Sequence, residues 1–143
     1  MHPNVLTTDD QLRALLAQTK RVAVLGIKTE AQADQASFYV PKYLQDAGLD
    51  VIPVPIYYPD VTTILGRPVF RALAHIDGEV DLVNVFRKAS DLKKHVADIL
   101  AKKPRAVWFQ LGIRDDVVAE ELAQAGIAVV QDKCIMVEHR RLL

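Results

Sequence analysis

The fold is decided by the stretch Val22-Ala23-Val24-Leu25-Gly26. A short, valine-rich apolar run that stops at a glycine is typical of a strand buried on both faces of a parallel sheet. Four more stretches show the same pattern, at residues 51–54, 80–86, 106–111 and 127–130. The chain therefore contains five candidate strands of one buried sheet.

Helical patterns alternate with these strands. Thr8 and Gln11 form a capping-box pattern, and we expect the helix that follows to run to about Gln18. Further helical stripes occupy residues 38–44, 92–100 and 114–125. This alternation predicts an α/β fold: a Rossmann-like, doubly wound single domain over residues 1–143, with a five-stranded parallel sheet between two helical layers.

Several local features are predicted from caps and breakers. Ser37 is expected to cap the second helix, which places Pro41 in the first turn, where proline is tolerated. Ser90 is expected to cap the third helix. Residues 69–73 favour a short helical turn inside an otherwise irregular connection, and residues 131–143 favour a polar tail with a few apolar residues.

The composition excludes several classes of protein. Half of the 143 residues are hydrophobic and a quarter are charged, which is typical of a folded domain. Lys and Arg number 18 and Asp and Glu also 18, so the whole chain has no charge to attract nucleic acid or an anionic membrane. A single cysteine allows no intrachain disulfide, and no signal peptide or membrane span is evident. A cytoplasmic location is the expectation.

A doubly wound sheet binds ligands outside the carboxyl ends of its strands, which directs attention to the turn after the first strand. Gly26 would let the backbone approach a phosphate, and Lys28 and Thr29 would add a cation and a hydroxyl. The turn lacks both G-x-G-x-x-G and the Walker A pattern, so neither standard nucleotide fingerprint is present. The alternative is that Gly26 only makes a tight turn.

Other strand ends carry candidate residues. Arg87 follows the third strand and suits a phosphate contact, with a salt bridge to Asp91 as the alternative. Pro53 and Pro55 could wall an adenine site or simply end a strand. Gln110 and Gly112 could line the floor of the site, whereas Trp108 is expected to belong to the core. His95 is expected to be a partly buried histidine with a hydrogen-bond partner.

Cys134 and His139 could form a nucleophile–base pair. The interpretation we favour is a small buried cysteine and a surface or capping histidine. The four histidines are scattered and form no metal-binding motif. No metal site is therefore predicted.

Several segments resemble a known family, the stand-alone CoA-binding proteins related to the CoA-binding domain of the succinyl-CoA synthetase α subunit. The resemblance covers almost the whole chain in order, and its most specific elements are Val85-Phe86-Arg87 and the Trp-x-Gln-x-Gly pattern of residues 108–112. The other matching segments are residues 22–26, 37–44, 48–54, 65–66, 80–84, 107–113 and 129–134.

The resemblance implies that coenzyme A binds at the strand ends, with no established catalysis. It implies the diphosphate at the turn after the first strand, the adenosine near the end of the second, and the phosphate or pantetheine part beside the third. The candidate binding residues are thus Gly26, Ile27, Lys28, Thr29, Ser37, Pro53, Val54, Pro55, Val85, Phe86, Arg87, Gln110 and Gly112.

This chain departs from the common family pattern in three places. Gly26-Ile27-Lys28 stands where the family commonly has Gly-Ala-Ser, Gln35-Ala36 stands where it has Arg-Pro, and Pro55-Ile56 stands where it has Asn-Pro. Lys28 would then replace the missing arginine as a cation for phosphate.

The partner expected from the sequence is CoA or an acyl-CoA, with no nucleic acid and no membrane. The chain would be a monomer or a homodimer. Three other functions stay open at this point: an acyl-CoA or thioester enzyme that uses Cys134, a module that binds NAD(P) or another nucleotide, and an interaction module that associates through the apolar residues 135–137. Asp60 is the nearest acidic residue that could hold a nicotinamide ribose after the second strand.

Overall fold

The computed structural model describes residues 1–143 and contains a five-stranded sheet in the order β2-β1-β5-β6-β7, with every pair parallel. The strands are β1 (Arg21–Leu25), β2 (Asp50–Val54), β5 (Leu82–Val85), β6 (Ala106–Phe109) and β7 (Ala128–Val130). The chain starts at β1, moves outward to β2, and returns across β1 to β5. The predicted Rossmann-like fold is confirmed.

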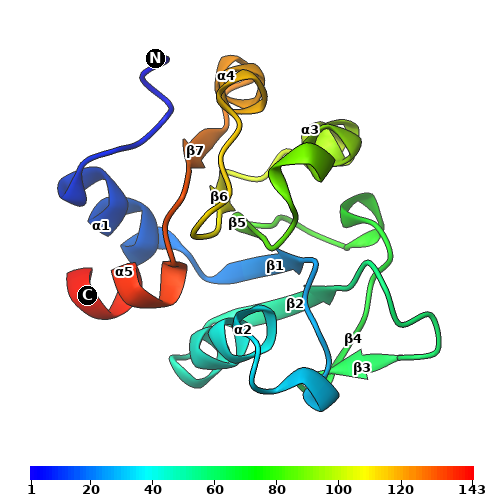
Figure 1. Cartoon of the computed structure of the whole chain (residues 1–143). Helices are drawn as coiled ribbons and strands as arrows, with labels where there is room; N and C mark the ends of the chain where they lie inside the picture. The colour runs from blue at the N-terminus through cyan, green and yellow to red at the C-terminus, as the bar shows by residue number, and fades with distance from the viewer.

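Helices cover both faces of this sheet (Figure 1). The helices are α1 (Asp9–Gln18), α2 (Ala36–Asp46), α3 (Val96–Lys102), α4 (Asp116–Gln124) and α5 (Ile135–Leu142). α1, α2 and α5 pack on one face, where Trp108 is fully buried, and α3 and α4 pack on the other, around Phe109. Side chains of successive strand residues alternate between these two apolar layers, as a pleated strand requires.

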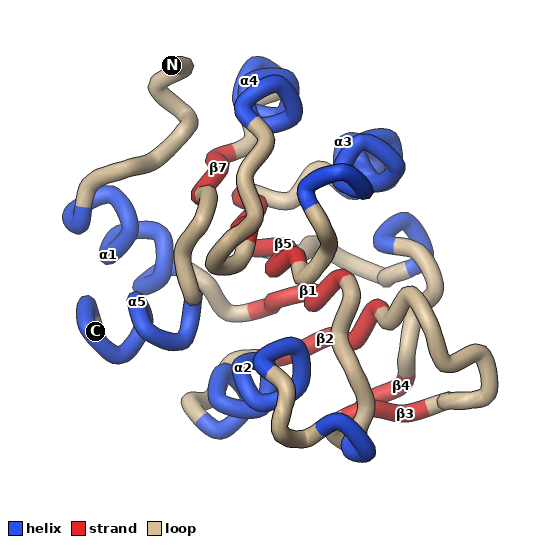
Figure 2. The backbone as a smooth tube through the Cα atoms, in the orientation of Figure 1, coloured by secondary structure: helices blue, strands red, loops and turns tan.

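The connection between β2 and β5 is mostly loop (Figure 2). It contains a short hairpin, β3 (Thr63–Ile64) and β4 (Arg67–Pro68), and a 3-10 turn over Leu73–His75. Leu65 and Gly66 both have positive φ, the backbone of a tight two-residue hairpin turn. The helical turn predicted for residues 69–73 is wrong in its position. The N–H groups of Val69 and Phe70 donate to the carbonyls of Thr62 and Pro53, and the helical turn begins only at Leu73.

The predicted start of α2 is also wrong. The helix begins at Ala36 with Gln35 at its N-cap, so Ser37 lies inside the first turn and makes no cap, and Pro41 lies in the helix interior. Proline has no N–H to offer the carbonyl four residues earlier, which here belongs to Ser37. That carbonyl accepts the backbone N–H of Lys28 instead, at 3.1 Å. Pro41 thereby frees the group that anchors the loop after β1.

Two further expectations need correction. Ser90 is not an N-cap, because it lies inside a 3-10 helix over Ala89–His95 that precedes α3 and has Lys88 at its N-cap. Residues 131–143 are not a polar tail, because they contain α5. Ile135 and Leu142 are seven residues apart and therefore share one helical face, which packs against α1 and α2. No helix is long and apolar enough to cross a bilayer.

Candidate functional site

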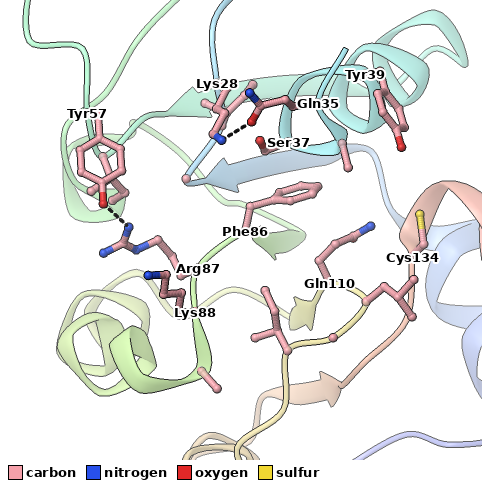
Figure 3. A pocket seen from close by; sticks show the side chains of 18 residues that line it. Lys28, Gln35, Ser37, Tyr39, Tyr57, Phe86, Arg87, Lys88, Gln110 and Cys134 are labelled. Atoms are coloured by element: carbon pink, nitrogen blue, oxygen red, sulfur yellow. Dashed lines mark hydrogen bonds between the residues drawn. The ribbon is translucent and has the colours of Figure 1, made fainter. Parts of the chain in front are cut away.

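A cavity of about 670 Å³ opens at the carboxyl ends of β1, β5 and β6, beside the first turn of α2 (Figure 3). Its volume lies within the roughly 300–1,000 Å³ of ordinary small-molecule sites. Ten of its 18 lining residues are hydrophobic. The lining residues are Gly26, Ile27, Lys28, Gln35, Ala36, Ser37, Tyr39, Ile56, Tyr57, Phe86, Arg87, Lys88, Ala89, Gln110, Leu111, Gly112, Ile113 and Cys134.

Gly26 lets two turns of the cavity touch. Its φ is +89°, and a Cβ atom built at this position would lie 2.3 Å from the carbonyl oxygen of Phe86. Only glycine adopts this backbone without strain and also leaves room for the turn after β5. The turns after β1 and β5 can therefore form adjacent walls.

Unpaired backbone donors line both walls. The N–H groups of Ile27, Ala36 and Ser37 make no hydrogen bond within the protein, and α2 has no side-chain cap. Across the cavity, the N–H groups of Lys88 and Ala89 are also free. Free N–H groups at a helix start, together with the helix dipole, favour a bound anion.

All charged side chains that line the cavity are positive. Lys28, Arg87 and Lys88 line the cavity, and none of its lining residues is Asp or Glu. The Nζ atom of Lys28 donates to the neutral side-chain oxygen of Gln35, so its charge is not neutralised there (Figure 3). Three cations without a carboxylate give this cavity a local positive charge, although the whole chain has zero formal net charge.

Arg87 is held by the protein on three sides. Its Nε donates to Nε2 of His95 at 3.1 Å, an Nη atom lies 3.5 Å from a carboxylate oxygen of Asp91, and the guanidinium lies 5.8 Å from the ring centre of Tyr57. The side chain is only 11% exposed. The salt bridge to Asp91, which the sequence left open as the alternative for Arg87, is therefore present, and these contacts hold the guanidinium at the cavity wall.

His95 is half-buried, as predicted. Burial lowers its pKa, and the nearby positive charge of Arg87 lowers the pKa further. The neutral imidazole leaves Nε2 as an acceptor for Arg87. His95 thus positions Arg87 as long as it stays unprotonated.

The far end of the cavity is uncharged. The Gln110 side chain that reaches it is almost fully buried, with an exposure of 5% for the residue. Its Oε1 accepts from Nδ2 of Asn84 at 3.2 Å and from the N–H of Ile135 at 3.4 Å. Its amide nitrogen points into the cavity, on the same side as Cys134 (Figure 3).

Most of the sequence-predicted site residues meet in this cavity. Those that line it are Gly26, Ile27, Lys28, Ser37, Phe86, Arg87, Gln110 and Gly112. Those that do not are Thr29, Pro53, Val54, Pro55 and Val85. Thr29 caps the short 3-10 helix Glu30–Gln32, and the others are buried in or beside strands β2 and β5.

Sequence reasoning missed the residues just beyond these positions. Ile56 and Tyr57 line the cavity in place of the prolines, because the chain turns toward the cavity only after it leaves β2. Arg71 donates to the carbonyls of Tyr57 and Val61, at 3.1 and 2.8 Å, and so fixes that loop. Gln35 was missed because α2 begins earlier than its pattern suggests.

Cys134 and His139 do not form a pair. His139 is hydrogen bonded through Nδ1 to the hydroxyl of Tyr43, at 2.8 Å, and burial lowers its pKa. Cys134 lies at the N-cap of α5, half-buried, and lines the cavity. Cys134 packs against the apolar layer around Trp108, as the favoured interpretation expects, but it is only partly buried and also lines the cavity.

Comparisons with known proteins identify the family of this chain. The CoA binding domain family matches residues 20–140. The chain is similar to the protein YneT of Bacillus subtilis (strain 168), with 33% identity over 90% of this chain and 92% of the relative. It is also similar to the solved structure of cell-free ID.343 from Thermus thermophilus, with 39% identity, a TM-score of 0.87, and coverage of 96% of this chain and all of that one.

A third similar structure is a protein from Pyrococcus horikoshii OT3. It is 29% identical, with a TM-score of 0.85 and coverage of 99% of this chain and 96% of that one. These relatives match the chain over nearly its whole length, so the likeness extends over the segments that form the cavity and not only over the sheet.

Proposed function

Because the chain belongs to the CoA binding domain family, we propose that it binds coenzyme A or an acyl-CoA in this cavity without catalysing a reaction. The diphosphate would lie at the turn after β1, and the ligand would extend along the carboxyl ends of the strands. One observation carries the proposal: the cavity presents three cations and no carboxylate, although the chain as a whole has no net charge.

The residues present fit the phosphate part of the ligand. The free N–H groups of Ile27, Ala36 and Ser37 face the space beside the ammonium of Lys28. Backbone N–H groups and a lysine supply several charge-assisted hydrogen bonds to phosphate oxygens. Ala36 lies where the family commonly has proline, and this alanine contributes an N–H that a proline would lack.

The two ends of the cavity suit the two ends of the ligand. Tyr57, Arg87 and Lys88 lie together at one end, and Gln110 and Cys134 lie at the other (Figure 3). The exposed ring of Tyr57 offers a surface on which an adenine base could stack. The uncharged end, reached past the ring of Phe86, suits the pantetheine arm.

Two observations count against the other functions considered. None of the lining residues is acidic, so no carboxylate is in place to hold a nicotinamide ribose; Asp60 lies outside the cavity. His139 is bound to Tyr43, so Cys134 has no histidine base beside it for thioester hydrolysis. Both observations favour binding of the intact cofactor.

Isothermal titration calorimetry tests the proposal directly. Coenzyme A is expected to bind at least tenfold more tightly than pantetheine, which lacks the phosphates, and more tightly than NAD. Equal affinities for coenzyme A and pantetheine would refute the phosphate site.

A pair of lysine variants tests the assigned cation. Lys28→Gln removes a charged hydrogen bond, worth about 1.5 kcal/mol at the low end for a partly exposed group, so affinity should fall about tenfold. Lys93→Gln removes the same charge from an exposed position outside the cavity and is the matched control. If both variants weaken binding equally, the effect is one of overall charge and Lys28 is not a phosphate ligand.

A further inference from the structure

The uncharged end of the cavity contains the only cysteine of the chain. Cys134 is half-buried at the start of α5 and lines the cavity. Figure 3 shows its sulfur directed toward the space that the Gln110 side chain also faces. A cysteine alone would indicate nothing, but its neighbour adds an independent sign of a ligand.

That sign is the amide nitrogen of Gln110. The residue is only 5% exposed, and both hydrogen bonds of its side chain go to the oxygen. The Nε2 group has no acceptor in the protein and points into the cavity. Because this donor opens into the cavity and not into the protein interior, it is available to an acceptor group of a bound ligand.

The acceptor expected here is a carbonyl of the pantetheine arm. The three cations lie away from Cys134, so a ligand with a phosphate head would direct its uncharged arm toward Gln110. The thiol at the tip of that arm would then lie near the sulfur of Cys134. This placement rests on the proposed function.

We propose that Cys134 forms a mixed disulfide with the thiol of coenzyme A, by exchange with the disulfide form of the cofactor. The Cys134 thiolate attacks one sulfur of CoA disulfide, a new bond forms between Cys134 and that CoA, and the old disulfide bond breaks. The second CoA leaves as a thiolate and takes up a proton from water. The exchange needs no other oxidant, and a reducing thiol reverses it.

The consequence is that the domain holds coenzyme A in two ways. Reduced cofactor binds reversibly through its phosphates, and oxidised cofactor becomes covalently attached to the same site. The attachment masks the thiol of the protein and the thiol of the cofactor together. The cavity would therefore act as a site of cofactor-specific thiol modification.

Intact-protein mass spectrometry tests the proposal. Reduced protein, freed of small thiols, is incubated with CoA disulfide or with glutathione disulfide at equal concentration. Because the chain has one cysteine, every thiol adduct is at Cys134. We expect one CoA adduct, removed by dithiothreitol, to form at least tenfold faster than the glutathione adduct.

A relocated cysteine supplies the matched control. The double variant Cys134→Ser, Val117→Cys presents a thiol at an exposed position of α4 outside this cavity. It should react with the two disulfides at similar rates. In the wild-type protein, excess adenosine 3′,5′-bisphosphate should slow the reaction with CoA disulfide and leave the glutathione reaction unchanged, a result that needs no variant.

The outcomes separate this proposal from the proposed function. Calorimetry with coenzyme A in the presence of reductant measures phosphate-dependent binding to the wild-type protein by itself. If coenzyme A binds but Cys134 reacts equally fast with both disulfides, the mixed-disulfide proposal is overturned and the binding function stands. If coenzyme A does not bind, both are overturned.

Discussion

Replacing Gly26 by alanine would test how the cavity is built. The added Cβ meets two separate obstacles. The φ of +89° disfavours any residue with a Cβ, which costs about 1–2 kcal/mol. The same atom would lie 2.3 Å from the carbonyl oxygen of Phe86, and such overpacking costs about a further 1–3 kcal/mol.

Gly48→Ala separates the two costs. Gly48 has a φ of +98°, and no atom lies within 4 Å of the place that a Cβ would occupy, so only the backbone cost applies. Urea denaturation should therefore show a loss of unfolding free energy of about 2–5 kcal/mol for Gly26→Ala and about 1–2 kcal/mol for Gly48→Ala. Thermal midpoints should fall by about 3–5 °C per kcal/mol at this chain length.

The two variants should also differ in ligand binding. In Gly26→Ala the turn that contains Phe86 and Arg87 must move away from the turn after β1, so the affinity for coenzyme A should fall at least tenfold. Gly48 lies outside the cavity, and its variant should bind normally. Equal losses of stability in both variants, within about 0.5 kcal/mol, would refute the close contact between the two turns.

Other predictions concern pH and the core. Burial lowers the pKa of His95 and of His139 in the folded protein. As the pH falls, these two histidines therefore become protonated in the unfolded chain before they do in the folded protein. The free energy of unfolding should therefore fall as the pH drops below about 6.5, until the histidines of the folded protein are also protonated. In the double variant His95→Gln, His139→Gln, the midpoint of urea denaturation should depend less on pH between about pH 5 and 7. The same pH dependence in the variant and the wild type would contradict this. Trp108→Ala should cost about 3–5 kcal/mol in urea denaturation, because the indole is fully buried and its Nε1 donates to the carbonyl of Lys133 at 2.7 Å; a loss below about 1 kcal/mol would contradict that role.

The strands of the sheet were predictable because burial on both faces makes each one a continuous apolar run. The stretch that ends at Gly26 contains β1, and the pattern holds for the other strands of the sheet. α5 was missed for a physical reason. Its apolar residues include the adjacent Ile135, Met136 and Val137, of which only Ile135 is buried in the core. Burial of Leu142 at the far end completes the helical face.

The sequence predicted the turns that line the cavity but not all of its lining residues. The rule that ligands bind at strand ends located Gly26, Arg87 and Gln110, since each lies at or just beyond the end of its strand. It could not locate Tyr57, because a loop held by Arg71 brings that ring to the cavity. Nor could it show that Pro41 releases a carbonyl to anchor the loop after β1, since that effect depends on where α2 begins.

In the proposed function, the phosphates of coenzyme A bind the free N–H groups around the turn after β1. The most direct measurement is a titration of isotope-labelled protein with coenzyme A, followed through its backbone amide NMR signals. The largest shifts are expected at Ile27, Ala36 and Ser37 and, across the cavity, at Lys88 and Ala89. Shifts confined to residues outside the cavity, or no shifts at all, would contradict this mode of binding.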